Sequence, residues 1–347
     1  MPGLEQYLSN PMRLRSGIPP DAWPLPDEHH LSWWRQIAAM PGTAIEYLGK
    51  RLPQIRMAIR EGASGTDAYA AAVLRGEPSD TQLGSEPYEN PSAIRLHVHA
   101  HFAGSLPVLE TPNRADFVHL YRALGSRCEP VDVPDGVHAL FVSGIPNPAR
   151  MRQLREEWGD QAGWEGEMKR LLAADRSWFY DRVIIMQHGA YGGLPAERVS
   201  AGMSEHAWAE RSGVLRLEHE CAHYATSRML GSFRMNIHDE LLADFMGFTK
   251  SLGGFSADLF LAAMGIEGDD IPVGARFRHY TAGLSEDEIR EVFDLAVRAA
   301  ASLETLAAGL PDDVCRASLL LALGEVSVPA MARSESGLHG LLRRIDQ

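Results

Sequence analysis

The stretch from Leu215 to Gly247 constrains the fold most strongly, because it places histidines and carboxylates in an otherwise apolar run. It contains the pattern HECAH, from His219 to His223. On an α-helix, residues four apart lie about 40° apart around the axis and one turn apart along it. Both imidazole rings can therefore reach one ion. Cys221, between them, points to the other side of the helix, and we exclude it as a ligand.

The same helix is predicted to be buried. Apolar side chains lie opposite the two histidines and also beside them: Val214, Leu215, Leu217, Cys221, Ala222 and Ala225. A helix on the protein surface has instead one polar face. We therefore interpret the histidines as part of a buried site. The alternative is a coincidental grouping of polar residues on two ordinary helices.

A second helix is predicted to begin at Ile237, with Asn236 as its N-cap. It carries Glu240 and Asp244, which are four apart and share one face. The opposite face is apolar and consists of Leu241, Leu242, Phe245 and Met246. The loop after Gly231 lets the chain reverse between the two helices. Glu240 can then bind the same ion, and Asp244 can accept a hydrogen bond from the second ring nitrogen of a ligating histidine.

Zinc suits two imidazole nitrogens and a carboxylate, and such a site leaves a fourth position open for water. Zinc lowers the pKa of that water to around 7 in enzymes of this kind. Glu220 follows His219 directly, where a carboxylate can take up the proton of the water and pass it to a leaving group. We expect one zinc ion at this site, although iron, cobalt or manganese could occupy the same ligands.

The pattern H-E-x-x-H, followed 17 residues later by E-x-x-x-D, resembles the gluzincin metallopeptidases, the thermolysin-like group. By this resemblance the zinc ligands are His219, His223 and Glu240. It also implies that Glu220 is the general base and that Asp244 orients His219. The resemblance covers about residues 181–250. The glycine and third histidine of the metzincins do not follow the motif, and HDELLAD stands in place of an N-x-x-x-D pattern.

The rest of the chain predicts an α+β fold. Apolar residues at three- and four-residue intervals indicate helices near the start, one of them split at Pro53. The segments IRLHVHAHF, HALFVSG and DRVIIMQHG indicate strands of a small sheet, with a helical stretch at 148–175 between the last two. After Glu197 the signals are helical. The regions that we expect are an N-terminal helical region (1–92), an α/β region with the sheet and a substrate-binding edge strand (93–200), and a helical zinc-binding region (201–347), with the zinc where the sheet-containing and helical parts meet.

Composition limits the partners and the compartment. The 347 residues are 45% hydrophobic and 23% charged, as in globular proteins, and the net charge is −13. This charge repels phosphate backbones and anionic lipids, so we expect no nucleic-acid or membrane partner. No run approaches the roughly 20 apolar residues of a spanning helix, and the start lacks a signal-peptide core. Cys128, Cys221 and Cys315 form no motif and are odd in number, which favours reduced thiols in the cytoplasm.

Three histidines form a weaker candidate site. His97, His99 and His101 are predicted to share one face of the first strand, since alternate residues of a strand point the same way. They could bind a second metal ion or line a substrate groove. The interpretation that we favour is a polar outer face of an amphipathic strand.

A second candidate is the segment 181–193, which precedes the metal helix. Gluzincins have an edge strand in this position that forms hydrogen bonds with an extended substrate. The backbone contacts would come from Gly189, Ala190 and Tyr191. The alternative is a plain strand that ends in a glycine turn.

A third candidate is the segment ARFRHYTAG, which follows the motif where this class often supplies a donor to the oxyanion of the tetrahedral intermediate. Tyr280 is our first choice, His279 the second and Arg278 the third.

Together these features predict a zinc-dependent hydrolase that cleaves a peptide or related amide bond. Because an unrestrained cytoplasmic protease would be harmful, a small-molecule amide or ester in a biosynthetic pathway is an alternative substrate. A further alternative is a non-catalytic scaffold in which the metal holds two lobes together. Glu220 argues against the scaffold, since a purely structural site needs no base and tends to fill its fourth position with another Cys or His. The sequence does not define the oligomeric state.

Overall fold

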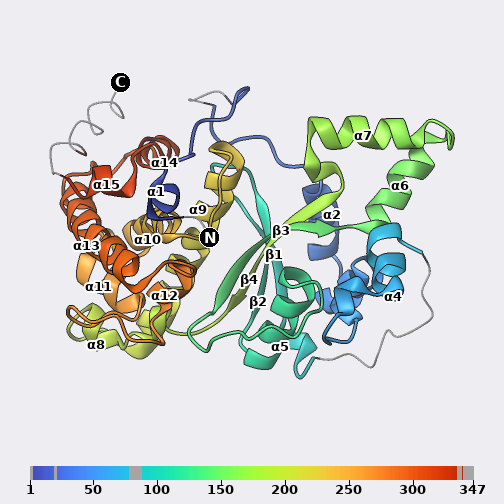
Figure 1. The fold of residues 1–347 in the computed structure, drawn as a ribbon. Coiled ribbons are helices and arrows are strands. Elements are labelled where there is room, and N and C mark those ends of the chain that lie inside the picture. Colours follow the sequence, from blue (N-terminus) through green and yellow to red (C-terminus); the bar gives the residue numbers. More distant parts are fainter. Residues whose placement is uncertain (1–2, 19–21, 78–87, 334–337, 339–347) are drawn as a thin grey trace. The chain divides into compact units, whose positions relative to one another are not determined.

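The computed structural model describes residues 3–18, 22–77, 88–333 and 338. The chain divides into two compact units (Figure 1). One consists of Pro26–His188 and contains the sheet; we call it the sheet unit. The other combines Met1–Leu25 with Gly189–Gln347 and is helical; we call it the helical unit. The predicted α+β class is confirmed. The three predicted regions do not coincide with these units, because the first 25 residues belong with the C-terminal helices.

The sheet has four strands in the order β1-β2-β4-β3. Their bounds are Arg95–His99 (β1), Leu106–Thr111 (β2), Ala139–Pro146 (β3) and Tyr180–Gln187 (β4). β4 pairs with β2 in parallel and with β3 antiparallel, and β1 pairs antiparallel with β2. The prediction of a substrate-binding edge strand at 181–193 is therefore wrong, because both sides of β4 already pair with neighbouring strands. β2 was not predicted; its sequence LPVLET includes a proline, which is unusual within a sheet.

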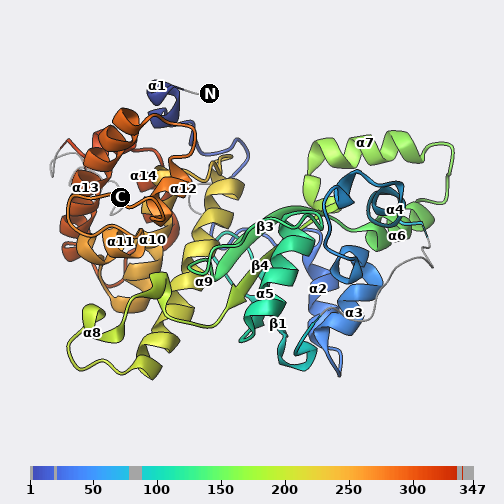
Figure 2. The same ribbon diagram turned by 60° about the horizontal axis from the view of Figure 1, so that its bottom comes forward.

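Helices cover one face of this sheet. Val183 and Ile185 of β4 and Leu109 of β2 pack into a hydrophobic core with Trp34 and Phe117. Trp34 lies on α2 (Leu31–Ala38) and Phe117 on α5 (Arg114–Leu120), which lies along the sheet (Figure 2). Alternate residues of β4 point to this core, as the period of a strand requires.

The remaining elements of the sheet unit are short. They are α3 (Ala44–Arg51), η1 (Pro53–Arg56), η2 (Ala63–Gly65), α4 (Asp67–Tyr69), η3 (Ala70–Arg75), η4 (Pro91–Ala93), η5 (Tyr121–Gly125), α6 (Pro148–Trp158), α7 (Trp164–Ala174) and η6 (Arg176–Trp178). The predicted split at Pro53 is confirmed, since α3 ends just before it. The helical stretch expected at 148–175 is two helices, because α6 ends at Gly159, which has a positive φ of 75°.

Two long helices form the centre of the helical unit. α9 (Glu205–Met229) carries the HECAH pattern, and α10 (Ile237–Leu252) begins where predicted, with the Asn236 side chain accepting a hydrogen bond from the Asp239 amide. The two helices approach closely at Gly247. A Cβ added there would lie 2.7 Å from the Leu215 carbonyl oxygen, so a glycine is needed at this crossing.

The other helices of this unit surround α9 and α10. They are α1 (Leu4–Leu8), η7 (Tyr191–Gly193), α8 (Ala196–Val199), α11 (Ala257–Ala263), α12 (Arg276–Tyr280), α13 (Glu286–Ala308), α14 (Arg316–Gly324) and α15 (Val328–Met331). The segment before residue 16 is hydrogen-bonded to α9, α10 and α12. Tyr7 Oη donates to the Tyr280 carbonyl oxygen (3.0 Å) and accepts from the Ile237 amide (3.1 Å), and the Arg15 amide donates to the Met229 carbonyl oxygen (2.8 Å).

α9 is buried around the HECAH pattern but not throughout. Val214, which the sequence predicted to be buried opposite the two histidines, is 45% exposed, whereas Cys221 is fully buried. The three cysteines carry free thiols. Within the described ranges, no helix is long and apolar enough to cross a membrane.

Candidate metal centre

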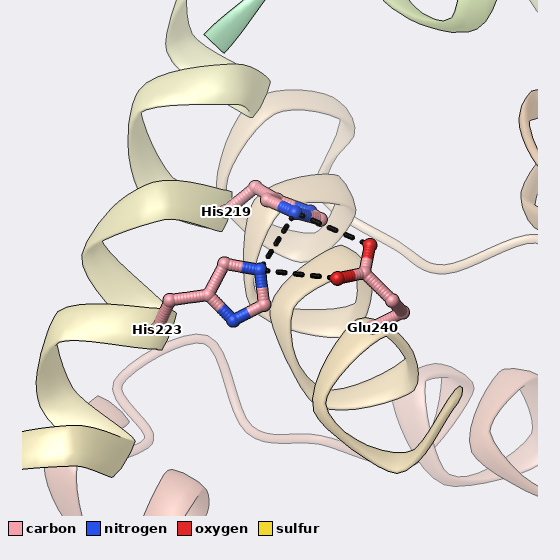
Figure 3. Close-up of side chains that lie close together, drawn as sticks. All are labelled: His219, His223 and Glu240. Carbon is pink, nitrogen blue, oxygen red and sulfur yellow. Dashed lines mark hydrogen bonds and ion pairs between the residues drawn. The ribbon is translucent and has the colours of Figure 1, made fainter. Parts of the chain in front are cut away.

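Three side chains from α9 and α10 converge in the helical unit (Figure 3). His223 Nε2 lies 3.0 Å from His219 Nε2 and 3.3 Å from Glu240 Oε1, and His219 Nε2 lies 3.5 Å from Glu240 Oε2. All three residues are buried, with 2–4% of their surface exposed. The structure therefore brings together the residues that the sequence singled out as ligands.

These spacings fit a tetrahedral ion. Four ligand atoms placed tetrahedrally at 2.0–2.1 Å from zinc lie about 3.3–3.4 Å from one another. The separations of 3.0 Å between the two Nε2 atoms and 3.3 Å between His223 Nε2 and Glu240 Oε1 are close to that value, and the 3.5 Å from His219 Nε2 runs to the other oxygen of Glu240. The donor set of two imidazoles and one carboxylate is also one that zinc accepts in catalytic sites. Across residues 3–18, 22–77, 88–333 and 338, this is the one group of three or more His, Cys, Asp or Glu side chains that could hold a metal ion.

A second layer of residues orients His219. Its Nδ1 lies 2.7 Å from Asp244 Oδ1, and Asp244 is fully buried. When Nδ1 carries the proton, it donates to this carboxylate, and the lone pair of Nε2 is directed to the ligand cluster. Tyr191 Oη donates to the same carboxylate oxygen and lies 3.1 Å from His219 Nδ1. The expected contact between Asp244 and His219 is therefore present, with Tyr191 as an additional partner.

The electrostatics of the cluster favour a cation. Burial alone would raise the pKa of Glu240, but His219, His223 and Arg276 outweigh burial and lower it to about 2. Burial alone would lower the pKa of His223, but Glu240 and Glu220 raise it to about 9. The same negative field that holds a proton on His223 would stabilise a divalent ion in its place.

Glu220 lies on α9 beside the cluster. It is 7% exposed, and its carboxylate interacts electrostatically with His223 and with Arg216, one turn earlier on the helix. A carboxylate that is buried beside two histidines in this way is available as a proton acceptor.

Tyr280 lies at the cluster, held by an arginine that the sequence analysis did not single out. Arg276 donates from Nη2 to Glu240 Oε2 (3.2 Å) and from Nε and Nη2 to Tyr280 Oη (3.1 and 3.0 Å). Burial raises the pKa of Tyr280 well above its ordinary value, so the hydroxyl remains protonated and able to donate.

The two other oxyanion candidates lie differently. His279 is exposed and its ring contacts the Tyr280 ring, with centroids 5.6 Å apart. The guanidinium of Arg278 forms an ion pair with Glu286 (2.8 Å) and donates to the Ile271 and Pro272 carbonyl oxygens. Arg278 therefore anchors a loop to the start of α13.

Sequence reasoning missed three side chains at the centre: Arg276, Tyr191 and Arg216. Arg276 lies four residues before Tyr280 in the segment ARFRHYTAG. Helical spacing would have placed the two side chains on one face, and this was the signal for Arg276. Arg216 precedes His219 by three and Glu220 by four residues and shares their helix face. Tyr191 was considered only for its backbone, and no local pattern indicates that its hydroxyl reaches Asp244.

The three histidines of the weaker candidate site do not form a metal-binding group in the described part of the chain. β1 ends at His99, so His101 does not belong to the strand, and the prediction of three histidines on one strand face is wrong. The chain turns after His99, and the His101 ring instead accepts a hydrogen bond from the Ala103 amide through Nδ1 (3.3 Å).

The fold and the site define an α+β protein with a buried cluster of two histidines and one glutamate from two crossing helices. The chain belongs to a family described as Family of unknown function (DUF7005), whose model matches residues 1–335. No curated protein and no solved structure matches the chain.

Proposed function

We propose that this protein is a zinc-dependent hydrolase of gluzincin type that cleaves a peptide or related amide bond. The observation that carries the proposal is the convergence of the buried side chains of His219, His223 and Glu240, with Glu220 next to His219 in the chain. Within the described part of the chain, this group offers three protein ligands and no fourth. Three ligands and a neighbouring base are the arrangement of a catalytic zinc site, whereas a structural site is closed by four.

Each nearby residue then has a chemical role. A divalent ion held by the three ligands would polarise the substrate carbonyl and lower the pKa of water. Glu220 takes up the proton of the attacking water and returns it to the leaving amine. Tyr280, held by Arg276, donates a hydrogen bond to the oxyanion that develops on the carbonyl oxygen. Asp244 and Tyr191 keep His219 in the tautomer that ligates through Nε2.

The substrate class follows from chemistry and burial. The side chains of the three ligands are 3–5% exposed, and this low exposure supports the alternative substrate, a small-molecule amide or ester. The free thiols support a reducing compartment, so we place the protein in the cytoplasm. The net charge of −13 supports the absence of nucleic-acid and membrane partners.

Metal analysis of matched variants tests the proposal. Purified wild-type protein is compared with His223→Ala, Glu220→Gln and the control His206→Ala, a histidine of α9 whose side chain is 86% exposed. We expect about one zinc per chain in the wild type, the control and Glu220→Gln, and loss of zinc in His223→Ala. Amide substrates should be cleaved by the wild type and the control but not by Glu220→Gln. A wild-type protein that binds no zinc, before or after zinc addition, contradicts the proposal.

A further inference from the structure

Two arginines lie over one aromatic ring beside the metal centre. Arg216 Cζ is 5.9 Å and Arg276 Cζ is 5.8 Å from the centroid of the Tyr191 ring. The hydroxyl of the same ring reaches His219 and Asp244. A pair of guanidinium groups is thus placed next to the ligand cluster, and the two positive charges repel each other.

The two arginines have different partners. Arg276 donates from Nε and Nη2 to Glu240 and Tyr280 at the cluster. Arg216 is 3% exposed, and its Nη2 donates to the carbonyl oxygens of Gly189 (3.1 Å) and Ala190 (3.4 Å). Its Nη1 is buried and has no hydrogen-bond partner in the part of the chain that the structure describes.

A buried donor without a partner is unusual in a native protein. Leaving it unpaired costs about 1–3 kcal/mol, and more when the group is charged. Burial lowers the pKa of this guanidinium to about 10, although the nearby carboxylate of Glu220 acts in the opposite direction. An anionic group bound at Nη1 would supply the missing hydrogen bond and add to the negative charge that Glu220 already provides.

The position of Arg216 relates this anion to the reaction site. Arg216 precedes His219 by three residues and Glu220 by four, so all three side chains share one face of α9. One helical turn spans about 5.4 Å. That rise is on the scale of the few bonds between a scissile amide and a carboxylate on the adjacent carbon.

We propose that Arg216 binds a carboxylate of the substrate through Nη1, on the carbon next to the scissile nitrogen. The substrate class is then an N-acyl amino acid or the C-terminal residue of a short peptide. This inference rests on the proposed hydrolase function, since only an enzyme has a substrate. The binding of the carboxylate itself can be measured without turnover. One available guanidinium nitrogen suits a carboxylate better than a phosphate dianion, which needs more donors.

The test compares a charged with a neutral probe. Zinc-loaded protein is titrated calorimetrically with N-acetylglycine and with N-acetylglycinamide, which differ only in the carboxylate. Every protein in this titration, including the one with wild-type Arg216, also carries Glu220→Gln, so that the probes bind but are not cleaved. We expect the wild type to bind the acid at least about 10-fold more tightly, as a charge-assisted hydrogen bond provides. Arg216→Gln should lose this preference and keep its zinc. Equal affinity of the wild type for both probes overturns the inference, as does an undiminished preference in Arg216→Gln.

Three further measurements separate the possible causes. Arg316→Gln is the matched control, because Arg316 is also partly buried and donates to a backbone carbonyl of α10, at Met246, and to Glu218; its preference should equal that of the wild type. If Arg216→Gln does not fold, Arg216→Lys replaces it under the same criterion. Binding of inorganic phosphate but not N-acetylglycine would overturn the carboxylate assignment. Preference for the acid, without amide cleavage by the protein that retains Glu220, would support this site and contradict the proposed hydrolase instead.

Discussion

Substitution of Asp244 tests how the cluster is organised, because this carboxylate contacts a ligand without being one. Asp244 Oδ1 lies 2.7 Å from His219 Nδ1 and also accepts from Tyr191 Oη. Asp244→Asn keeps an oxygen acceptor but removes the negative charge. Asp244→Ala removes the acceptor altogether and leaves the buried tyrosine hydroxyl without its carboxylate partner.

The magnitude follows from what each variant removes. Loss of a carboxylate that orients a ligating histidine lowers metal affinity by about 10- to 100-fold, or roughly 1.4–2.7 kcal/mol. We expect Asp244→Asn near the lower end of this range and Asp244→Ala near the upper end. The control is Asp258→Asn on α11, whose side chain is 77% exposed; its affinity should equal that of the wild type.

Competition with a fluorescent zinc chelator at pH 7.5 measures the zinc affinity of each variant. His223→Ala serves as the reference for a lost ligand. If Asp244→Ala binds zinc within twofold of the wild type while His223→Ala does not bind it, His219 does not depend on Asp244 for its orientation, and our account of the second layer is refuted.

Other properties of the helical unit can be tested in the same way. In the metal-free protein the pKa of His223 is raised to about 9, so the ring is protonated below that pH. Zinc binding at pH 7.5 should therefore release about one proton, and the zinc affinity should fall as the pH drops. Calorimetry in buffers of different ionisation enthalpy measures the proton release. Tyr7→Phe removes the acceptor of the Ile237 amide and should lower the free energy of unfolding by about 1–3 kcal/mol in urea titrations. Gly247→Ala places a Cβ against the Leu215 carbonyl oxygen and should lower it by a similar amount, about 1–3 kcal/mol, whereas an unchanged value would mean that the two helices separate at little cost.

The ligand cluster was predictable because its geometry is largely local. The spacings of His219 with His223 and of Glu240 with Asp244 depend only on the period of a helix, and a short loop joins the two helices. The start of the second helix was also predictable, since Asn236 caps it through its own side chain. The contact between the two helices could be expected from their apolar faces.

The surroundings of the cluster depend on longer-range packing, and there the sequence was a poorer guide. Arg276 and Tyr191 approach the histidines from separate segments, and nothing in their local sequence specifies that approach. The order of strands is likewise not encoded in the pattern of one strand, so the position of β4 between β2 and β3 was missed. β2 was not predicted because it contains Pro107, and proline is unusual within a sheet. β2 pairs with β4, so that β4 lies inside the sheet.

The division of the chain bears on the order in which its parts can form during synthesis. The sheet unit is one continuous stretch, Pro26–His188, whereas the helical unit needs residues from before and after it. The Arg15 amide has its acceptor at Met229, and the Leu4 amide has its acceptor at Glu288 (3.1 Å). On the ribosome, the first segment must therefore wait until nearly 300 residues have been made, about 15–60 s at the usual elongation rate of roughly 5–20 residues per second. The cluster of His219, His223 and Glu240 is therefore completed only after the sheet unit has emerged from the ribosome.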